Sequence, residues 1–356
     1  MINIVDLYFI IIVGLKNLGF NSGSKIYLIL FVFGCAIVGS KIVSNKYTKK
    51  EILIMCLLVI IGILDFWIGK SPTIMFTAIA LCSLKNVDLN RLLKIILVVK
   101  IVTFISMIIL SFSGIISEPV VTLYRDGKYI KRYLFGYNHP NEAHIAFASI
   151  IFIYMYLNMD KCTVLKSIVL FVLNYIMYIF TVSRTGLITV TLCILIWGLW
   201  NKFPKMHNKL VFIAKKAYSI LFIITIFSAL LYSDSNISVE ADRYLSGRLN
   251  YNSYLLKNYF PPIIGNEIYN KFVNIDNGYI ALMYNGGISA FILISYLYIK
   301  TCKILDRKNK SNELLLILFF LSYTLTESFL PSISVNISLI FLAYAIFDNT
   351  KKEENT

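Results

Sequence analysis

Charged residues are scarce in this sequence. Aspartate, glutamate, lysine and arginine make up 15% of the 356 residues, whereas about 25% is usual in a soluble domain. Hydrophobic residues make up 58%, and the mean hydropathy is +0.73. This composition excludes a soluble globular protein and predicts an all-α, polytopic membrane protein.

Signatures of nucleotide, metal and disulfide chemistry are also missing. The sequence has no GxxxxGK[ST] loop, no GxGxxG after a strand and no HExxH motif, so coupling to nucleotide hydrolysis is not indicated. The six cysteines are scattered without a CxxC pair, which indicates neither a disulfide framework nor a metal site. We therefore expect no metal and no cofactor.

Long hydrophobic runs are what the sequence does contain. A helix needs about 20 residues to cross the hydrocarbon core of a bilayer. The runs predict about 10–12 transmembrane helices within a single transmembrane domain over residues 1–356. Their ranges are 4–15, 26–43, 52–69, 72–84, 95–113, 143–158, 164–182, 186–200, 211–232, 277–299, 313–328 and 332–347.

The basic residues predict the orientation of these helices. With both termini in the cytoplasm, the inner segments hold 21 lysines and arginines and the outer segments hold 12, in agreement with the positive-inside rule. We therefore expect a multi-pass protein of the cell membrane with cytoplasmic N- and C-termini. The formal net charge of +15 then reflects topology and contact with anionic membrane lipids, and no nucleic-acid partner is expected.

Arginine is concentrated on the predicted outer side. Two of the 21 inner basic residues are arginines, against five of the 12 outer ones. Arginine binds phosphate through two nitrogens and stays charged when partly desolvated. The two long outer loops, 114–142 and 233–276, are therefore predicted to form an anion site with Arg125, Arg132, Arg184, Arg243 and Arg248.

The densest polar stretch runs from Arg132 to His144. We expect Asn138 to cap a helix with Pro140 in its first turn. His139 would then lie at a helix N-terminus, which disfavours the protonated imidazole and suits a hydrogen bond or a general base; the alternative is a simple capping turn. For His144, one turn deeper, packing or a hydrogen bond to a neighbouring span is expected.

The other polar motifs each have a structural alternative. Arg184, in Ser183-Arg-Thr-Gly186, is either a site residue or a snorkelling anchor. For Arg243, in the Asp242–Arg248 segment, the alternative is a local salt bridge to Asp242 or Glu240. Asp276 is either a helix cap or a carboxylate of the site, and Glu327 near Pro331 is a weaker candidate of the same kind.

In their order, these motifs resemble the polysaccharide polymerases of the Wzy type, within the O-antigen ligase and polymerase superfamily. The resemblance covers roughly residues 125–290. It rests on Arg132 with Gly136-Tyr-Asn-His-Pro-Asn141, on Ser183–Gly186, on Ser246-Gly-Arg248, and on Asp276-Asn-Gly-Tyr279 with Gly286-Gly-Ile288. The ligase branch is known for a histidine in its large late outer loop, and this chain has no histidine after His207. That departure favours the polymerase branch.

The resemblance implies a GT-C-like membrane glycosyltransferase, inverting and metal-independent, that acts on undecaprenyl-diphosphate-linked oligosaccharide. A flippase and a chain-length regulator are its expected protein partners. Arginines would hold the diphosphate leaving group and offset its developing charge, and a base would assist the acceptor hydroxyl. The expected catalytic residues are His139, Arg132, Arg184, Arg248 and Asp276, and the expected substrate-binding residues are Arg125, Asn138, Asn141, Glu142, Arg243, Tyr279 and Glu327.

Three other functions remain open at this point. A flippase or exporter of lipid-linked oligosaccharide would carry polar residues at mid-membrane in pseudo-symmetric halves, whereas the ionisable residues here cluster at the outer rim. An O-antigen-ligase-like transferase would join the glycan to another acceptor. A non-catalytic assembly or sensory membrane protein is the third alternative.

Overall fold

The computed structural model describes residues 3–20, 25–116, 120–125, 127–200, 204–233, 235–266 and 275–347. The described chain is mainly helical, and its only sheet is one two-stranded hairpin. The sequence predicts a single transmembrane domain, and the contacts gather into two compact units. Unit 1 comprises Met1–Ser24 and Asp88–Leu210, and unit 2 comprises Lys25–Val87 and Val211–Thr356.

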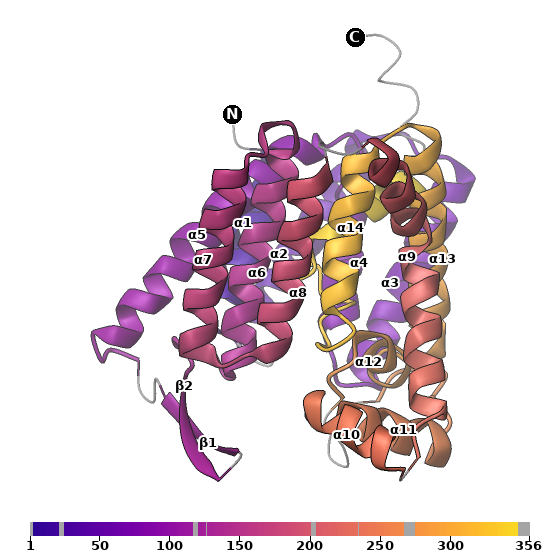
Figure 1. Cartoon of the computed structure of the whole chain (residues 1–356). Helices are drawn as coiled ribbons and strands as arrows, with labels where there is room; N and C mark the ends of the chain where they lie inside the picture. The colour runs from indigo at the N-terminus through magenta and orange to yellow at the C-terminus, as the bar shows by residue number, and fades with distance from the viewer. Residues whose placement is uncertain are drawn as a thin grey trace. The chain divides into compact units, whose positions relative to one another are not determined.

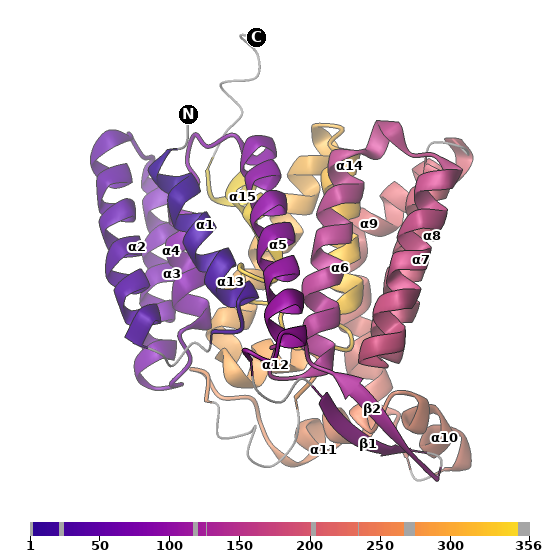
Figure 2. The ribbon, with the colours of Figure 1, turned by 90° about the vertical axis from the view of Figure 1, so that its left-hand side faces the viewer.

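Unit 1 is a helical bundle with a β-hairpin at one end (Figures 1 and 2). Two of its helices, α1 and α5, lie side by side. Asp6 near the start of α1 pairs with Arg91 near the start of α5 at 2.7 Å, which shows that the two helices run in the same direction. The elements of unit 1 are α1 (Ile4–Asn17), α5 (Leu89–Phe112), β1 (Val120–Arg125), β2 (Lys128–Tyr133), α6 (Pro140–Leu157), a 3-10 turn (Met159–Lys161), α7 (Val164–Thr181) and α8 (Arg184–Trp200).

Unit 2 contains the remaining helices. In this unit α3 and α4 form an antiparallel pair, and Gly62 lets them approach closely, because a Cβ there would lie 2.8 Å from the Cα of Met75. Its elements are α2 (Lys25–Ser44), α3 (Lys49–Trp67), α4 (Thr73–Cys82), α9 (Pro204–Leu230, which begins in unit 1), α10 (Asn236–Tyr244), α11 (Arg248–Asn258), α12 (Gly278–Asn285), α13 (Gly287–Arg307), α14 (Ser311–Tyr323), a 3-10 helix (Ile337–Leu342) and α15 (Ala343–Ile346).

The helix α7 shows the polarity expected inside a bilayer. Its exposed side chains are apolar, for example Leu165 and Ile179, whereas its buried face includes the polar residues Asn174 and Thr181. This arrangement is the reverse of a water-facing helix, in which the polar residues point outward.

Four described helices are long and apolar enough to cross a membrane, judged by length and composition. Five further apolar helices are shorter, with 10–17 residues each. The chain therefore fits the coarse expectation of a helical polytopic membrane protein, while the helix count and the sidedness stay predictions. The four long segments are Leu89–Phe112, Val164–Thr181, His207–Leu230 and Gly287–Arg307.

Two expectations about the spans near the C-terminus are wrong. The segment 277–299 was expected to be continuous, but it is broken into α12 and α13 at Gly286 and Gly287. The first amides of α13 donate to the carbonyls of Pro262 and Ile263 at 2.8 and 3.1 Å, so a neighbouring loop replaces the missing helical partners. The segment 332–347, expected as a spanning helix, is a 3-10 helix followed by four α-helical residues.

The two segments predicted as outer loops contain secondary structure that the hydropathy pattern missed. The segment 114–142 holds the β-hairpin, in which Tyr124 pairs with Tyr129 across the strands. An Asp126-Gly127 dipeptide between two strand-like runs is a hairpin signal that was available in the sequence. The segment 233–276 holds α10 and α11, which are short and mostly polar, so hydropathy does not reveal them.

Candidate functional site

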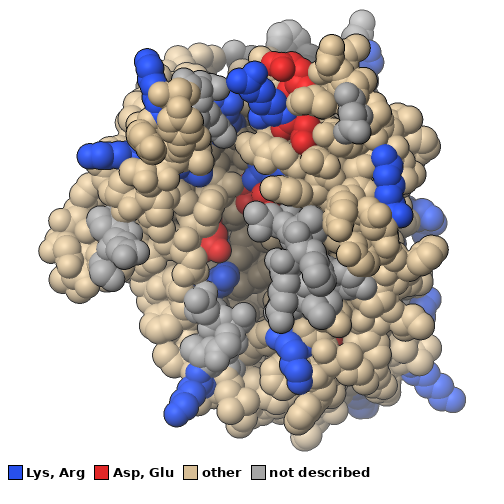
Figure 3. Space-filling model, turned by 90° about the horizontal axis from the view of Figure 1, so that it is seen from below, with Lys and Arg blue, Asp and Glu red and all other residues tan. Residues whose placement is uncertain are grey.

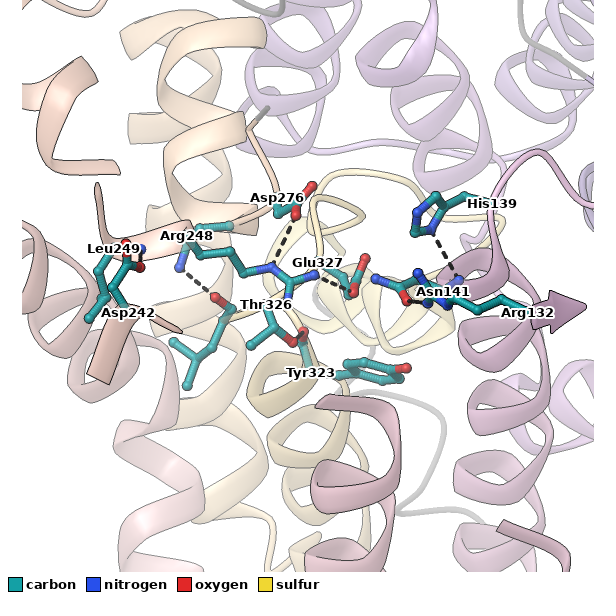
Figure 4. Close-up of polar contacts among 12 residues, drawn as sticks. Arg132, His139, Asn141, Asp242, Arg248, Leu249, Asp276, Tyr323, Thr326 and Glu327 are labelled. Atoms are coloured by element: carbon teal, nitrogen blue, oxygen red, sulfur yellow. Dashed lines mark hydrogen bonds and ion pairs between the residues drawn. The ribbon is translucent and has the colours of Figure 1, made fainter. Parts of the chain in front are cut away.

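Six of the twelve predicted site residues fall into two polar clusters, one in each unit, and each cluster contains a buried arginine. We call the first the Arg132 network, formed by Arg132, His139, Asn141, His144, Asn174 and Thr181. We call the second the Arg248 cluster, formed by Arg248, Asp276 and Glu327. Figure 4 shows members of both clusters.

Arg132 is held by two hydrogen bonds from different nitrogens. Its Nε donates to the backbone carbonyl of Thr181 at 2.7 Å, and its Nη2 donates to Oδ1 of Asn141 at 2.8 Å. The residue is 9% exposed, and both of these acceptors are uncharged. The pair of bonds fixes the plane of the guanidinium between the ends of α6 and α7.

The N-cap of α6 is His139, whereas the sequence suggested Asn138. The Nδ1 atom of His139 accepts from the amide of Asn141 at 3.1 Å, and Pro140 occupies the first turn as expected. In this geometry the neutral imidazole carries its proton on Nε2. The nitrogen that a base would use is therefore engaged in capping. Asn138 instead donates to Oε2 of Glu142 at 3.4 Å.

His144 makes the expected hydrogen bonds to a neighbouring helix. Its Nε2 lies 3.0 Å from Oδ1 of Asn174, and its Nδ1 lies 3.1 Å from Oγ1 of Thr181. The amide nitrogen of Asn174 donates to Leu187 and Thr191 on α8, so its oxygen accepts and Nε2 of His144 carries the proton. Three helices are thereby joined behind Arg132.

The turn between α7 and α8 has a strained backbone. Val182 adopts φ +50, a left-handed conformation that is costly for a β-branched residue. It directly follows Thr181, whose carbonyl binds Arg132, and it precedes Ser183, whose Oγ is buried without a hydrogen-bond partner among the described residues. Arg184 is the first residue of α8 and is partly buried.

Tyr137 is buried beside this network, in the segment that leads to α6. It is 6% exposed, and its hydroxyl has no hydrogen-bond partner among the described residues. Burial raises the pKa of the Tyr137 hydroxyl well above its usual value, and the charge of Glu142 acts in the same direction. The hydroxyl therefore stays protonated at neutral pH.

In unit 2, Arg248 bridges two carboxylates. Its Nε donates to Oδ2 of Asp276 and its Nη2 to Oε1 of Glu327, both at 3.0 Å. Figure 4 shows the guanidinium lying between the two acids. The Arg248 side chain is 8% exposed, that of Glu327 10%, and that of Asp276 42%. The cluster is a buried ion triad with one carboxylate open to its surroundings.

Side chains close to this triad cap the two helices, α11 and α12, that begin beside it. Gly247, with φ +84, precedes α11 and has no side chain to cap it. The carboxylate of Asp242 accepts from the amide of Leu249 at 2.7 Å instead. Asn277 caps α12 by accepting from the amides of Tyr279 and Ile280. Asp276 is therefore not the helix cap, and its carboxylate faces Arg248.

The structure does not bring every predicted residue into these clusters. Tyr279 is fully buried, and its hydroxyl donates to the carbonyl of Tyr218. Arg243 is mostly exposed and lies 4.0 Å from Glu240, which is the local ion pair considered as its alternative. The backbone of Arg125 ends β1, while its side chain lies outside the described part of the structure.

Sequence reasoning missed Asn174, Thr181 and Asn277. Asn174 and Thr181 are seven residues apart on one helix, so they lie on the same face. Two polar residues on one face of an otherwise apolar span are the signal that would have identified them. Asn277 was named only as part of a motif, and its cap role follows from its position before α12.

Surface charge does not form one continuous basic patch at the end where α10 and α11 lie. In the part of this face that the structure describes, lysine and arginine side chains stand apart, with a few carboxylates among them (Figure 3). Among the described residues, no group of three or more His, Cys, Asp or Glu side chains could hold a metal ion.

Comparison with known protein families, curated proteins and solved structures finds no match for this chain.

Proposed function

We propose that this protein polymerises undecaprenyl-diphosphate-linked oligosaccharide repeat units into a surface polysaccharide. The reaction takes place at the outer face of the cytoplasmic membrane, as an inverting glycosyl transfer that needs no metal. The growing glycan on its lipid diphosphate is the donor, and a single lipid-linked repeat unit is the acceptor.

One observation carries the proposal: motif residues far apart in the sequence come together around a buried arginine within each unit. Arg132 meets Thr181, 49 residues later, just before the Ser183–Gly186 motif. Arg248 meets Asp276 and Glu327, which are 28 and 79 residues later. Burying arginine is costly unless its donors are satisfied, so each buried arginine marks a built polar site, and Arg132 is the one whose two acceptors named above are uncharged.

The chemistry of the donor fits arginine catalysis. The bond that breaks joins the anomeric carbon to a diphosphate oxygen, and negative charge develops on that oxygen. Preorganised cations offset such charge most effectively where water is excluded. Arg132 and Arg184 are the arginines proposed for this task. Arg248 is not assigned to the leaving group, because two of its nitrogens already bind carboxylates.

A deletion strain tests the function. We expect it to accumulate single lipid-linked repeat units at the outer face of the membrane and to make no polymer. Analysis of its lipid-linked glycans separates the alternatives. Full-length chains that remain on the lipid would indicate a ligase, and repeat units trapped on the inner face would indicate a flippase. Either result would contradict the proposal.

Sidedness is tested by cysteine labelling in a variant that lacks the six native cysteines. Tyr129 on the hairpin is 79% exposed, and Phe260 after α11 is 96% exposed. Tyr129→Cys and Phe260→Cys should both react with an impermeant maleimide in intact cells. Lys308→Cys, in the lysine-rich segment after α13, is the matched inner control and should react only after lysis. The reverse pattern would overturn the proposed orientation.

A further inference from the structure

The short helix α10 exposes the apolar side of an amphipathic sequence. Ile237, Ala241 and Tyr244 follow the helical repeat, so they lie along one face, which we call the apolar face of α10. All three are exposed, Ile237 by 85% and Tyr244 by 67%. The one buried residue of α10 is the acidic Asp242. A helix that packs on a protein core beside water has the opposite arrangement, with its apolar face buried.

The buried side of α10 does not account for its stability. The helix has nine residues, and helices shorter than about 12–15 residues are marginal in water unless another surface stabilises them. Asp242 accepts the amide hydrogen of Leu249 at the start of α11. The apolar face lies about 100–160° around the helix from Asp242, so it points away from this contact. Stabilising α10 therefore requires a second, apolar surface.

The connection to α9 keeps α10 within reach of a membrane surface. The part of α9 that is long and apolar enough to cross a bilayer ends at Leu230, and α10 begins six residues later, at Asn236. Six residues span at most about 20 Å. Exposed apolar side chains occur at Phe227, Leu230 and Leu231 at the end of α9, and again at Ile237. The apolar face of α10 therefore continues the kind of surface that α9 presents to lipid.

The charged side of α10 fits the same location. Glu240 and Arg243 have side chains that are 58% and 70% exposed, and they lie 4.0 Å apart. An interfacial helix has this division, with its apolar face in the boundary between headgroups and acyl chains and its charged face in water. Tyrosine, as at position 244, is common at that depth. Because α10 contains one basic and two acidic residues, apolar contact and not attraction to anionic lipid would hold it there.

We propose that α10 is an interfacial helix that lays its apolar face into the surface of the bilayer that α9 crosses. The bilayer then supplies the apolar surface that α10 does not find in its own unit. Through the bond between Asp242 and Leu249, the anchored helix also fixes the start of α11, where Arg248 lies. This lipid contact does not depend on the proposed polymerase activity.

Fluorescent labels on single cysteines test the lipid contact. Serine would replace Cys35, Cys56 and Cys162, while the three buried cysteines stay. An environment-sensitive fluorophore is attached at Ile237→Cys, or at Arg243→Cys as the matched control, in full-length protein in phosphatidylcholine nanodiscs. The apolar face of an interfacial helix lies about 5–10 Å into the boundary region. Lipids with a nitroxide high on the acyl chain should therefore quench the label at 237 several-fold more than the label at 243, and aqueous iodide should show the reverse order.

A second position on the apolar face makes the result independent of one variant. Tyr244→Cys should behave as Ile237→Cys, and size-exclusion chromatography checks that each labelled variant is folded. Stronger quenching by iodide than by lipid nitroxide at both positions would place the face in water and overturn the proposal. Shielding from both quenchers would mean that protein covers the face, and equal lipid quenching at 237, 244 and 243 would mean that α10 is immersed. Either result would also overturn it.

Discussion

Replacing Arg132 with lysine should lower polymer formation about a hundredfold, which corresponds to roughly 3 kcal/mol of lost transition-state stabilisation. Arg132 uses one nitrogen for the carbonyl of Thr181 and another for the side chain of Asn141. A lysine has a single nitrogen and cannot make both bonds in the same plane. The charge would remain, but its position would not. Initial rates of extension of lipid-linked repeat units measure the effect.

Lys131 is the matched control, because it lies on the same strand with an exposed side chain. Lys131→Ala should keep a near-normal rate, and the amount of folded protein should be compared for both variants by size-exclusion chromatography in detergent. A near-normal rate for Arg132→Lys would show that the guanidinium does not act on the diphosphate. The Arg132 network would then be only a structural link between the hairpin and the helices.

The Arg132 network illustrates what sequence can and cannot supply. The run from Arg132 to His144 was identified because polar groups are rare in this chain, and the hydrogen bond from His144 to a neighbouring helix was expected and is confirmed. Asn174 and Thr181 were overlooked because each is a single polar residue in a long apolar run. Their importance depends on which helix face meets α6, and that follows only from tertiary packing.

Most helix positions followed from hydropathy, because a long apolar run has few alternatives to a buried or membrane-spanning helix. The pairing of charges did not follow in the same way. Asp276 and Glu327 were both named as candidates, but nothing in the sequence indicated that one arginine would bind both. A local salt bridge to Asp242 or Glu240 was the alternative considered, chiefly for Arg243. The pairing of Arg248 with both acids depends on tertiary packing, which the sequence does not show.

The largest effect on stability is expected at Gly265, next to the break between α12 and α13. A Cβ at this position would lie 1.9 Å from the carbonyl oxygen of Asn285 and 2.4 Å from Oδ1 of Asp65. The first of these atoms belongs to the backbone and cannot move aside as a flexible side chain would. Gly265→Ala should therefore cost more than about 3 kcal/mol, above the usual range for overpacking. Thermal unfolding of the detergent-purified protein measures the loss.

Gly39→Ala is the control for this substitution. Gly39 lies within α2, and a Cβ there would meet nothing within 4 Å. Alanine is a better helix former than glycine by up to about 1 kcal/mol, so this variant should be as stable as the wild type or slightly more stable. If Gly265→Ala unfolds at the wild-type temperature, the loop at residue 265 does not pack against the end of α12 as described. A loss of thermal stability confined to Gly265→Ala would show that this close backbone approach stabilises the break between α12 and α13. The position of α12, which begins two residues after Asp276, would then depend on the same contact.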